Sequence, residues 1–206
     1  MRKIILLTIF CTLVSTAAFS QDNEIPHNDV NFSVGAGVPT GSDTSYLTNA
    51  PMIALMYGYR FNRFIQAESG FQMAFGAANN QNAEESEFGT VQGGDHELMF
   101  PFSGRFYVPL PLEKWQLSLG GGGAYLHYAE TAVNAQGSPC FTCTTRGGWG
   151  TQGFLTIRYL IGDNFYVGTT AQVVSAHING DAVGNVPAIS TTDQWTNVLF
   201  NLGFRF

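Results

Sequence analysis

Apolar and polar residues alternate along residues 196–206, at the carboxy-terminal end of the chain. Val198, Phe200, Leu202, Phe204 and Phe206 share one face, and Asn197, Asn201, Gly203 and Arg205 share the other. In a strand, successive side chains point to opposite sides, so this stretch has one oily and one polar surface. Such alternation at full strand length predicts a strand with hydrocarbon outside and a polar interior behind it.

Seven further segments repeat this two-faced pattern. They are residues 30–38, 52–61, 65–75, 97–108, 115–126, 151–160 and 165–175. Each is near the length of about ten residues that a tilted membrane strand needs. The chain also has 24 glycines and 14% aromatic residues, which favours an ordered all-β protein. We therefore predict an all-β fold, an eight-stranded antiparallel up-and-down transmembrane β-barrel.

The connections between these segments alternate in length. Residues 62–64, 109–114 and 161–164 are short, whereas residues 39–51, 76–96, 127–150 and 176–194 are long and polar. Short turns at one end and long loops at the other are typical of an outer-membrane barrel. Two alternatives remain at this point: a soluble β-sandwich, and a barrel of ten strands if a long loop contains a hairpin.

An arginine recurs where strands meet the short turns. Arg60, Arg105, Arg158 and Arg205 lie on the polar phase of their strands, and arginine facing lipid is unfavourable by roughly 2–4 kcal/mol at the midplane. These arginines and Glu68 predict a charge network in the lumen. The short turn sets Arg60 opposite Gln66 and diagonal to Glu68, within reach of an arginine side chain. We expect Glu68 to pair with an arginine while a second arginine shares the carboxylate, either to satisfy buried charge or to gate ions.

The amino-terminal residues 1–20 are predicted to be a secretory signal, with a basic start, an apolar stretch and small residues before Gln21. Residues 21–206 then form one barrel domain. Without the signal, 7 basic and 15 acidic residues remain, a formal net charge near −8. This charge disfavours nucleic-acid binding, which depends on neutralisation of phosphates by Lys and Arg.

Few residues suggest chemistry. Cys140 and Cys143 lie in the third long connection, and an oxidising compartment favours a disulfide between them over a metal site. No cofactor motif is present. Glu84, Glu85 and Glu87 form an acidic run, expected to be solvated or to bind divalent cations weakly.

The signal, the eight two-faced strands, the alternating connections and the terminal Phe206 together resemble the bacterial outer-membrane β-barrel domain family, with small barrels of the OmpA, OmpX and OmpW type. The resemblance implies an outer-membrane location with both termini in the periplasm. It implies contact with outer-membrane lipids and lipopolysaccharide, and Phe206 as part of the signal that the barrel-assembly machinery reads. Partners at the loops are unknown from sequence.

Members of this family differ in role, so the resemblance leaves function open. The favoured interpretation is a structural or interaction protein that presents four extracellular loops over a plugged polar lumen. One alternative is a narrow channel for small solutes. Another is a lipid A-modifying hydrolase, since Ser175 and His177 share a face and resemble the residue types of lipid A deacylases, with Asp181 as the nearby acid. We do not expect an enzyme.

Overall fold

The structure is a computed structural model of the whole chain. It describes residues 25–40, 48–76, 84–86, 89–91, 95–133, 139–181 and 188–206. For residues 84–86, 89–91, 95, 130–133, 139–144 and 189, it describes the backbone alone. The predicted signal segment and Glu87 lie outside the described residues.

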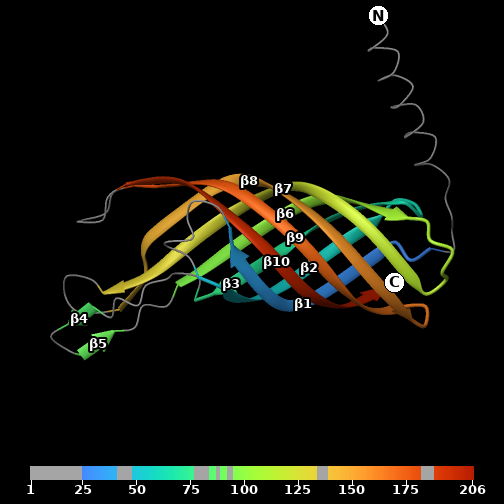
Figure 1. Cartoon of the computed structure of the whole chain (residues 1–206), viewed down its shortest axis with the longest axis horizontal. Helices are drawn as coiled ribbons and strands as arrows, with labels where there is room; N and C mark the ends of the chain where they lie inside the picture. The colour runs from blue at the N-terminus through green and yellow to red at the C-terminus, as the bar shows by residue number, and fades with distance from the viewer. Residues whose placement is uncertain are drawn as a thin grey trace, which may run out of the picture.

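Eight of the described strands close into one barrel (Figure 1). They are β1 (Asn28–Pro39), β2 (Ala50–Arg60), β3 (Ile65–Phe75), β6 (Asp95–Val108), β7 (Trp115–Val133), β8 (Pro139–Ile161), β9 (Phe165–Gly180) and β10 (Ile189–Arg205). Each strand pairs antiparallel with its neighbours, in the order β1-β10-β9-β8-β7-β6-β3-β2. The predicted fold class is confirmed, and the alternative of a β-sandwich is wrong. No helix in the described part of the chain is long and apolar enough to span a membrane.

The barrel is closed by pairing between its first and last strands. Their register runs from Asp29 opposite Arg205 to Pro39 opposite Trp195. The backbone N–H of Asn28 donates to the Phe206 carbonyl at 2.9 Å, and the N–H of Phe206 donates to the Asn28 carbonyl at 3.0 Å. Closure removes the free strand edges at which a sheet would otherwise pair with another chain. We call the end that holds Phe206 and the turns 61–64, 109–114 and 162–164 the short-turn end, and the opposite end the long-loop end (Figure 1).

The barrel is apolar outside and largely polar inside, the reverse of a soluble protein. The outward side chain of Phe102 is 71% exposed, whereas the inward Arg158 is 1% exposed. Outward residues on every barrel strand are predominantly aromatic or aliphatic, as the alternation predicted. This arrangement is favourable only in hydrocarbon, because in water the large apolar belt would be exposed to solvent at a high cost in free energy.

Aromatic rings gather around the short-turn end. Neighbouring rings pack against one another. Tyr59 packs with Phe61 and Phe204 with Phe206 along one strand end, and Phe64 with Phe106, Trp115 with Tyr159 and Phe165 with Phe204 between adjacent segments. Rings of this kind are favourable at headgroup depth, where one side is oily and the other is wet. They mark one border of the membrane-spanning belt.

The strands extend further toward the long-loop end than the sequence predicted. The starts and ends at the short turns agree to within two residues, but β7 continues to Val133 and β8 begins at Pro139. The connection predicted at 127–150 is therefore mostly paired strand, with a register shift between Glu130 and Ala132. Beyond the membrane the outward face no longer needs apolar residues, so the alternation ends while the backbone pairing continues.

The second long connection contains a hairpin of β4 (Glu84–Ser86) and β5 (Gly89–Val91). This hairpin forms a separate two-stranded sheet and does not join the barrel wall. The alternative of ten barrel strands is therefore wrong.

Two glycines on β6 and β7 test how closely the barrel wall packs. A methyl group on the inward Gly122 would collide with the carbonyl oxygen of Phe102, whereas no atom lies within 4 Å of a methyl group on the outward Gly104. We expect Gly122→Ala to destabilise the barrel by about 1–3 kcal/mol, because backbone must shift, and Gly104→Ala to be tolerated. Urea unfolding in lipid vesicles, followed by tryptophan fluorescence, measures both. Equal midpoints for the two variants would contradict the packing described here.

Candidate functional site

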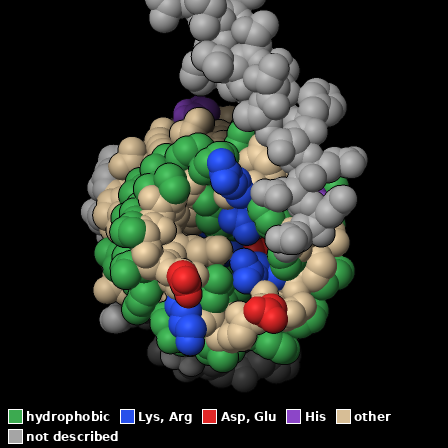
Figure 2. All heavy atoms as spheres, turned by 90° about the vertical axis from the view of Figure 1, so that its right-hand side faces the viewer, with side chains coloured by type: hydrophobic (Ala, Val, Ile, Leu, Met, Phe, Trp, Pro, Cys, Tyr) green, Lys and Arg blue, Asp and Glu red, His purple; other side chains and the backbone are tan. Residues whose placement is uncertain are grey.

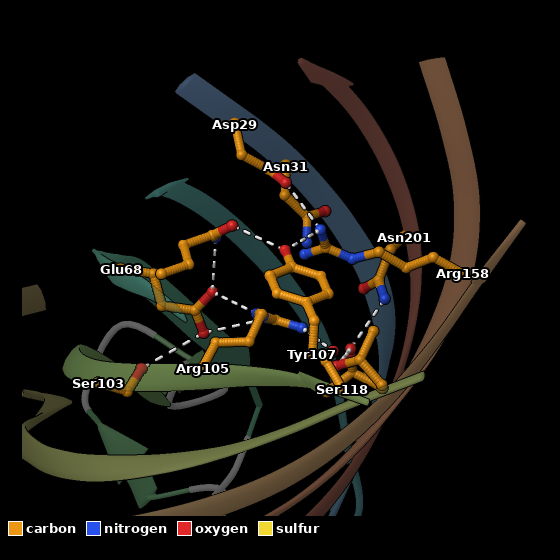
Figure 3. A network of polar contacts seen from close by, with 12 residues as sticks. Asp29, Asn31, Glu68, Ser103, Arg105, Tyr107, Ser118, Arg158 and Asn201 are labelled. Atoms are coloured by element: carbon orange, nitrogen blue, oxygen red, sulfur yellow. Dashed lines mark hydrogen bonds and ion pairs between the residues drawn. The ribbon is translucent and has the colours of Figure 1, made fainter. Parts of the chain in front are cut away.

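The inward charges meet in the half of the lumen near the short-turn end. Glu68 of β3 and Arg105 of β6 form a two-pronged ion pair, with Nε to Oε2 at 2.8 Å and Nη2 to Oε1 at 3.1 Å (Figure 3). Ser103 donates to Oε1 of Glu68, and the remaining terminal nitrogen of Arg105 donates to Ser118 at 2.9 Å. Both charged side chains are nearly inaccessible to water, so paired geometry is what makes their burial tolerable.

A second ion pair joins β1 to β8 across the lumen. Nη1 of Arg158 donates to Asp29 at 2.7 Å, and the hydroxyl of Tyr166 donates to the other carboxylate oxygen at 2.5 Å. The guanidinium of Arg158 also lies over the Tyr166 ring, 4.2 Å from its centroid. Arg158 was predicted to belong to the network, but its partner Asp29 was missed. Asp29 precedes the predicted segment by one residue and continues the inward phase of Asn31 and Ser33, so a longer strand would have included it.

Tyr107 connects the two ion pairs (Figure 3). Its hydroxyl accepts from Arg158 at 3.0 Å and donates to Gln66 at 2.7 Å, and the amide of Gln66 donates to Glu68 at 3.3 Å. The path from Asp29 to Ser118 is thus continuous and crosses the whole barrel interior. Charge-assisted hydrogen bonds of this kind fix the side chains in place across this level of the lumen.

Amides and hydroxyls from three strands, β8, β9 and β10, extend the polar interior beyond the ion pairs. Asn201 donates to Thr170 at 2.8 Å, which lies 2.8 Å from Thr156. Gln172 donates to Gln152 and accepts from Asn197 at 3.0 Å. A cavity of about 20 Å³, bordered by Glu68, Arg105 and these groups, is the room left among them. It is close to the space that a single water molecule requires.

The interior near the long-loop end is apolar, which the sequence did not predict. The buried cluster there comprises Ala50, Met52, Ala74, Met99, Ala124, Leu126, Tyr128, Val174, Ala176, Ile178, Trp195 and Leu199. The expectation of a polar lumen is therefore correct for one half of the barrel only. These residues lie on the inward phase of their strands, but several belong to the stretches that were predicted to be loops.

Glu97 lies within this apolar layer. It is 2% exposed, and neither carboxylate oxygen accepts a hydrogen bond of standard geometry from the residues that the structure describes, the Trp195 indole being the donor beside it. Its polar neighbours are Asp193 and Trp195. A buried carboxylate without hydrogen bonds is destabilising, in contrast to the fully bonded Glu68.

Arg60 and Arg205 lie at the short-turn end, apart from both carboxylates. Arg60 was predicted to reach Glu68, but its Nη2 donates to the Arg63 carbonyl at 3.4 Å and its guanidinium lies 3.8 Å from the centroid of Tyr107. Arg60 and Arg105 are both paired opposite Gln66, and sheet twist brings only one of the two diagonals close to Glu68. Arg205 donates to the Asp163 carbonyl at 2.8 Å. Glu68, Arg105 and Arg158 of the predicted set thus share one continuous network, whereas Arg60 and Arg205 donate to backbone carbonyls instead.

The structure also gives the positions of Phe206, Cys140 and Cys143, and the roles predicted for them stay predictions. Phe206 seals the β1–β10 seam and stacks on Phe204, and its recognition by an assembly machinery stays a prediction. Cys140 and Cys143 belong to β8 and not to a loop. Their side chains are outside the described set, so the disulfide also stays a prediction.

The candidate Ser175 and His177 pair is not brought together. His177 lies 3.2 Å from the Ser190 hydroxyl and 3.4 Å from that of Thr192, both across the β9–β10 ladder. Ser175 is paired opposite Gln194 and Thr151. Among the described residues, no carboxylate bonds to His177. The arrangement has neither the nucleophile–base contact nor the orienting acid of a hydrolase.

Comparison with solved structures supports the fold described above. No protein-family model matches the sequence, and no curated protein matches it. Solved structures do match. The Neisserial surface protein A aligns with a TM-score of 0.57 at 12% identity, covering 87% of this chain and 97% of that one. Ail, the attachment invasion locus protein of Yersinia pestis, aligns with a TM-score of 0.54 at 14% identity over 88% of this chain and 100% of that one. OprG of Pseudomonas aeruginosa aligns with a TM-score of 0.52 at 12% identity over 89% and 98%.

The chain has the fold of the small eight-stranded outer-membrane β-barrels. At these identities the likeness establishes architecture and not activity. Together with the apolar belt, it supports a location in the bacterial outer membrane, where hydrocarbon surrounds the outward residues. The role of this outer-membrane barrel must come from its own residues.

Removing Asp29 tests the ion pair that the sequence did not predict. Asp29→Ala leaves Arg158 buried and unpaired, and we expect a loss of about 3–5 kcal/mol in unfolding free energy. In Asp29→Ala/Arg158→Met both charges are gone, so most of that loss is recovered. Asp163→Ala, at an exposed turn position, is the control. Urea titration in vesicles reports all three, and a double variant as unstable as the single one would argue against the pair.

The two inward glutamates are expected to respond oppositely to the same substitution. Glu68→Gln leaves the Arg105 charge unbalanced and lowers the unfolding midpoint. Glu97→Gln removes a buried carboxyl that has no hydrogen bond of standard geometry among the described residues. We therefore expect this variant to have a higher unfolding midpoint than the parent. Parallel urea titrations at neutral pH compare the variants, and shifts of the same sign would refute the difference between the two environments.

Proposed function

We propose that this protein is a closed structural barrel that presents its long-loop end for interaction and does not form an open pore. The observation that carries the proposal is the filled interior. A continuous polar network crosses the barrel from Asp29 to Ser118, and the apolar cluster around Met99, Leu126 and Trp195 lies beyond it. An eight-stranded barrel is just wide enough for its side chains to fill.

We further propose that the short-turn end and both termini face the periplasm, and that the long-loop end faces the outside. The support is the asymmetry of the connections, since outer-membrane barrels have short periplasmic turns and longer external loops. Beyond the apolar belt, β7 and β8 carry the wall outward as a long hairpin that offers a paired surface to partners. Ail, a barrel of similar architecture, has been solved in complex with the heparin analogue sucrose octasulfate, so this fold is compatible with a binding role.

Outer-membrane lipids and lipopolysaccharide are the proposed surroundings, and the assembly machinery is the proposed reader of Phe206. A narrow channel is the second candidate function, favoured by the small cavity beside Glu68 and Arg105. A lipid A-modifying hydrolase has less support, because the His177 ring is bonded to Ser190 and Thr192 and lacks an acid partner among the described residues.

Conductance measured across a planar bilayer distinguishes a closed structural barrel from a narrow channel. We expect the inserted protein to give no stepwise current, because the ion pairs and the apolar layer leave no continuous aqueous path. The Glu68→Gln variant is expected to give a trace indistinguishable from the parent. Discrete current steps in the parent that change in Glu68→Gln would overturn the closed wall and establish the channel.

A further inference from the structure

A cleft at the short-turn end combines a cationic wall with an apolar one. It lies between the turn 61–64 and the connection 109–114 and has a volume of about 230 Å³. Arg60 and Arg63 line one side, and Leu112 and Trp115 line the other. Viewed from this end, basic side chains gather in the hollow of the barrel and apolar side chains surround it (Figure 2).

The arginines at this end have hydrogen-bonding capacity that the protein does not use. Arg60 is 6% exposed and Arg205 is 7% exposed, yet the Nε–H of each lacks a partner among the described residues. Each donates through one terminal nitrogen to a backbone carbonyl, that of Arg63 or Asp163. Buried donors of this kind are unfavourable unless a ligand or water accepts from them.

The same end carries an excess of positive charge. Arg158 and Arg205 both lie near enough to repel the charge on Arg60, and Asp29, which attracts it, is already paired with Arg158. Glu113 is the acidic side chain that lines the cleft. Arg60 and Arg63 line the cleft, and Arg158 and Arg205 add positive charge near Arg60. This arrangement favours an anion in the cleft, and guanidinium groups match phosphate oxygens especially well.

The apolar wall narrows the chemical class of the ligand. Leu112 is 57% exposed and Trp115 is 46% exposed, and Trp115 packs edge-on against Tyr159 within the aromatic girdle. A small soluble anion would satisfy the arginines and leave this surface uncovered. A phospholipid satisfies both, because its phosphate and its acyl chains occupy the depth at which the girdle and the cleft lie.

We propose that this cleft binds a phospholipid of the adjoining leaflet, with its phosphodiester held by Arg60 and Arg63 and an acyl chain against Leu112 and Trp115. A lipid headgroup and a soluble phosphate ester both carry the phosphate that the arginines would bind. Only the lipid also has an acyl chain that can cover Leu112 and Trp115. A lipid held here would anchor the short-turn end at a fixed depth in the membrane.

Native mass spectrometry of the mature protein in a nonionic detergent, titrated with dioleoyl phosphatidylglycerol, tests the site. We expect saturable binding of one lipid that Arg60→Gln/Arg63→Gln weakens on the order of tenfold, the effect of losing charge-assisted hydrogen bonds. Arg63→Gln alone, at an exposed position, gives a smaller loss and keeps the test valid if the Arg60 substitution prevents folding. Glu113→Gln removes the opposing charge and is expected to tighten binding.

Two control variants distinguish a lipid site from a soluble-anion site and from a general effect of net charge. Arg146→Gln makes the same charge change near the long-loop end and is expected to leave binding unchanged. Leu112→Ser is expected to weaken phosphatidylglycerol but not glycerol 1-phosphate, measured by competition. Equal losses in Arg146→Gln and Arg63→Gln, or the absence of saturation, would overturn the site. Full competition by glycerol 1-phosphate with no effect of Leu112→Ser would make it a soluble-anion site and overturn the lipid assignment.

Discussion

The constraint on which this structure depends is that a charge buried in the membrane-spanning interior must be balanced by a partner inside the barrel. The outside of the wall faces hydrocarbon, so an inward arginine cannot turn outward to be solvated. Arg105 and Arg158 are therefore matched by Glu68 and Asp29. The partners are 37 and 129 residues apart in sequence. Glu68 and Arg105 lie on neighbouring strands, whereas Asp29 and Arg158 join two strands that are not neighbours in the wall.

The interior changes character along the barrel axis. The half near the short-turn end is filled by ion pairs and amides, and the half near the long-loop end is filled by Met, Leu, Ile and Trp side chains. This second layer is a buried apolar cluster inside the wall. Glu97 and its neighbour Asp193 are buried acids beside this apolar layer, whereas the carboxylate of Glu68 is satisfied by Arg105, Ser103 and Gln66.

Whereas Arg105 and Arg158 are paired with carboxylates, Arg60 and Arg205 bind backbone carbonyls. Both lie where the strands leave the membrane, and there the alternatives to an ion pair are a backbone carbonyl, an aromatic face or a ligand. The tyrosine ring of Tyr107 supports Arg60 by a cation–π contact while its hydroxyl serves Arg158 and Gln66. One aromatic side chain thus contacts both the polar network of the interior and the arginine that lines the cleft at the short-turn end.

The alternation of residue types determined the barrel, its eight strands and the inward phase of the four arginines, because hydrocarbon selects each outward position independently of its neighbours. Tyr59, Phe106 and Phe204 could be assigned to the outside from the sequence for that reason. The extension of β7 and β8, the apolar layer around Trp195 and the partners of each arginine were decided by the tertiary structure. Inward side chains meet across strands that are far apart in sequence, and beyond the membrane the backbone pairs without requiring an apolar face. Sequence periodicity reports what surrounds a strand, and only the closed barrel determines which inward groups touch.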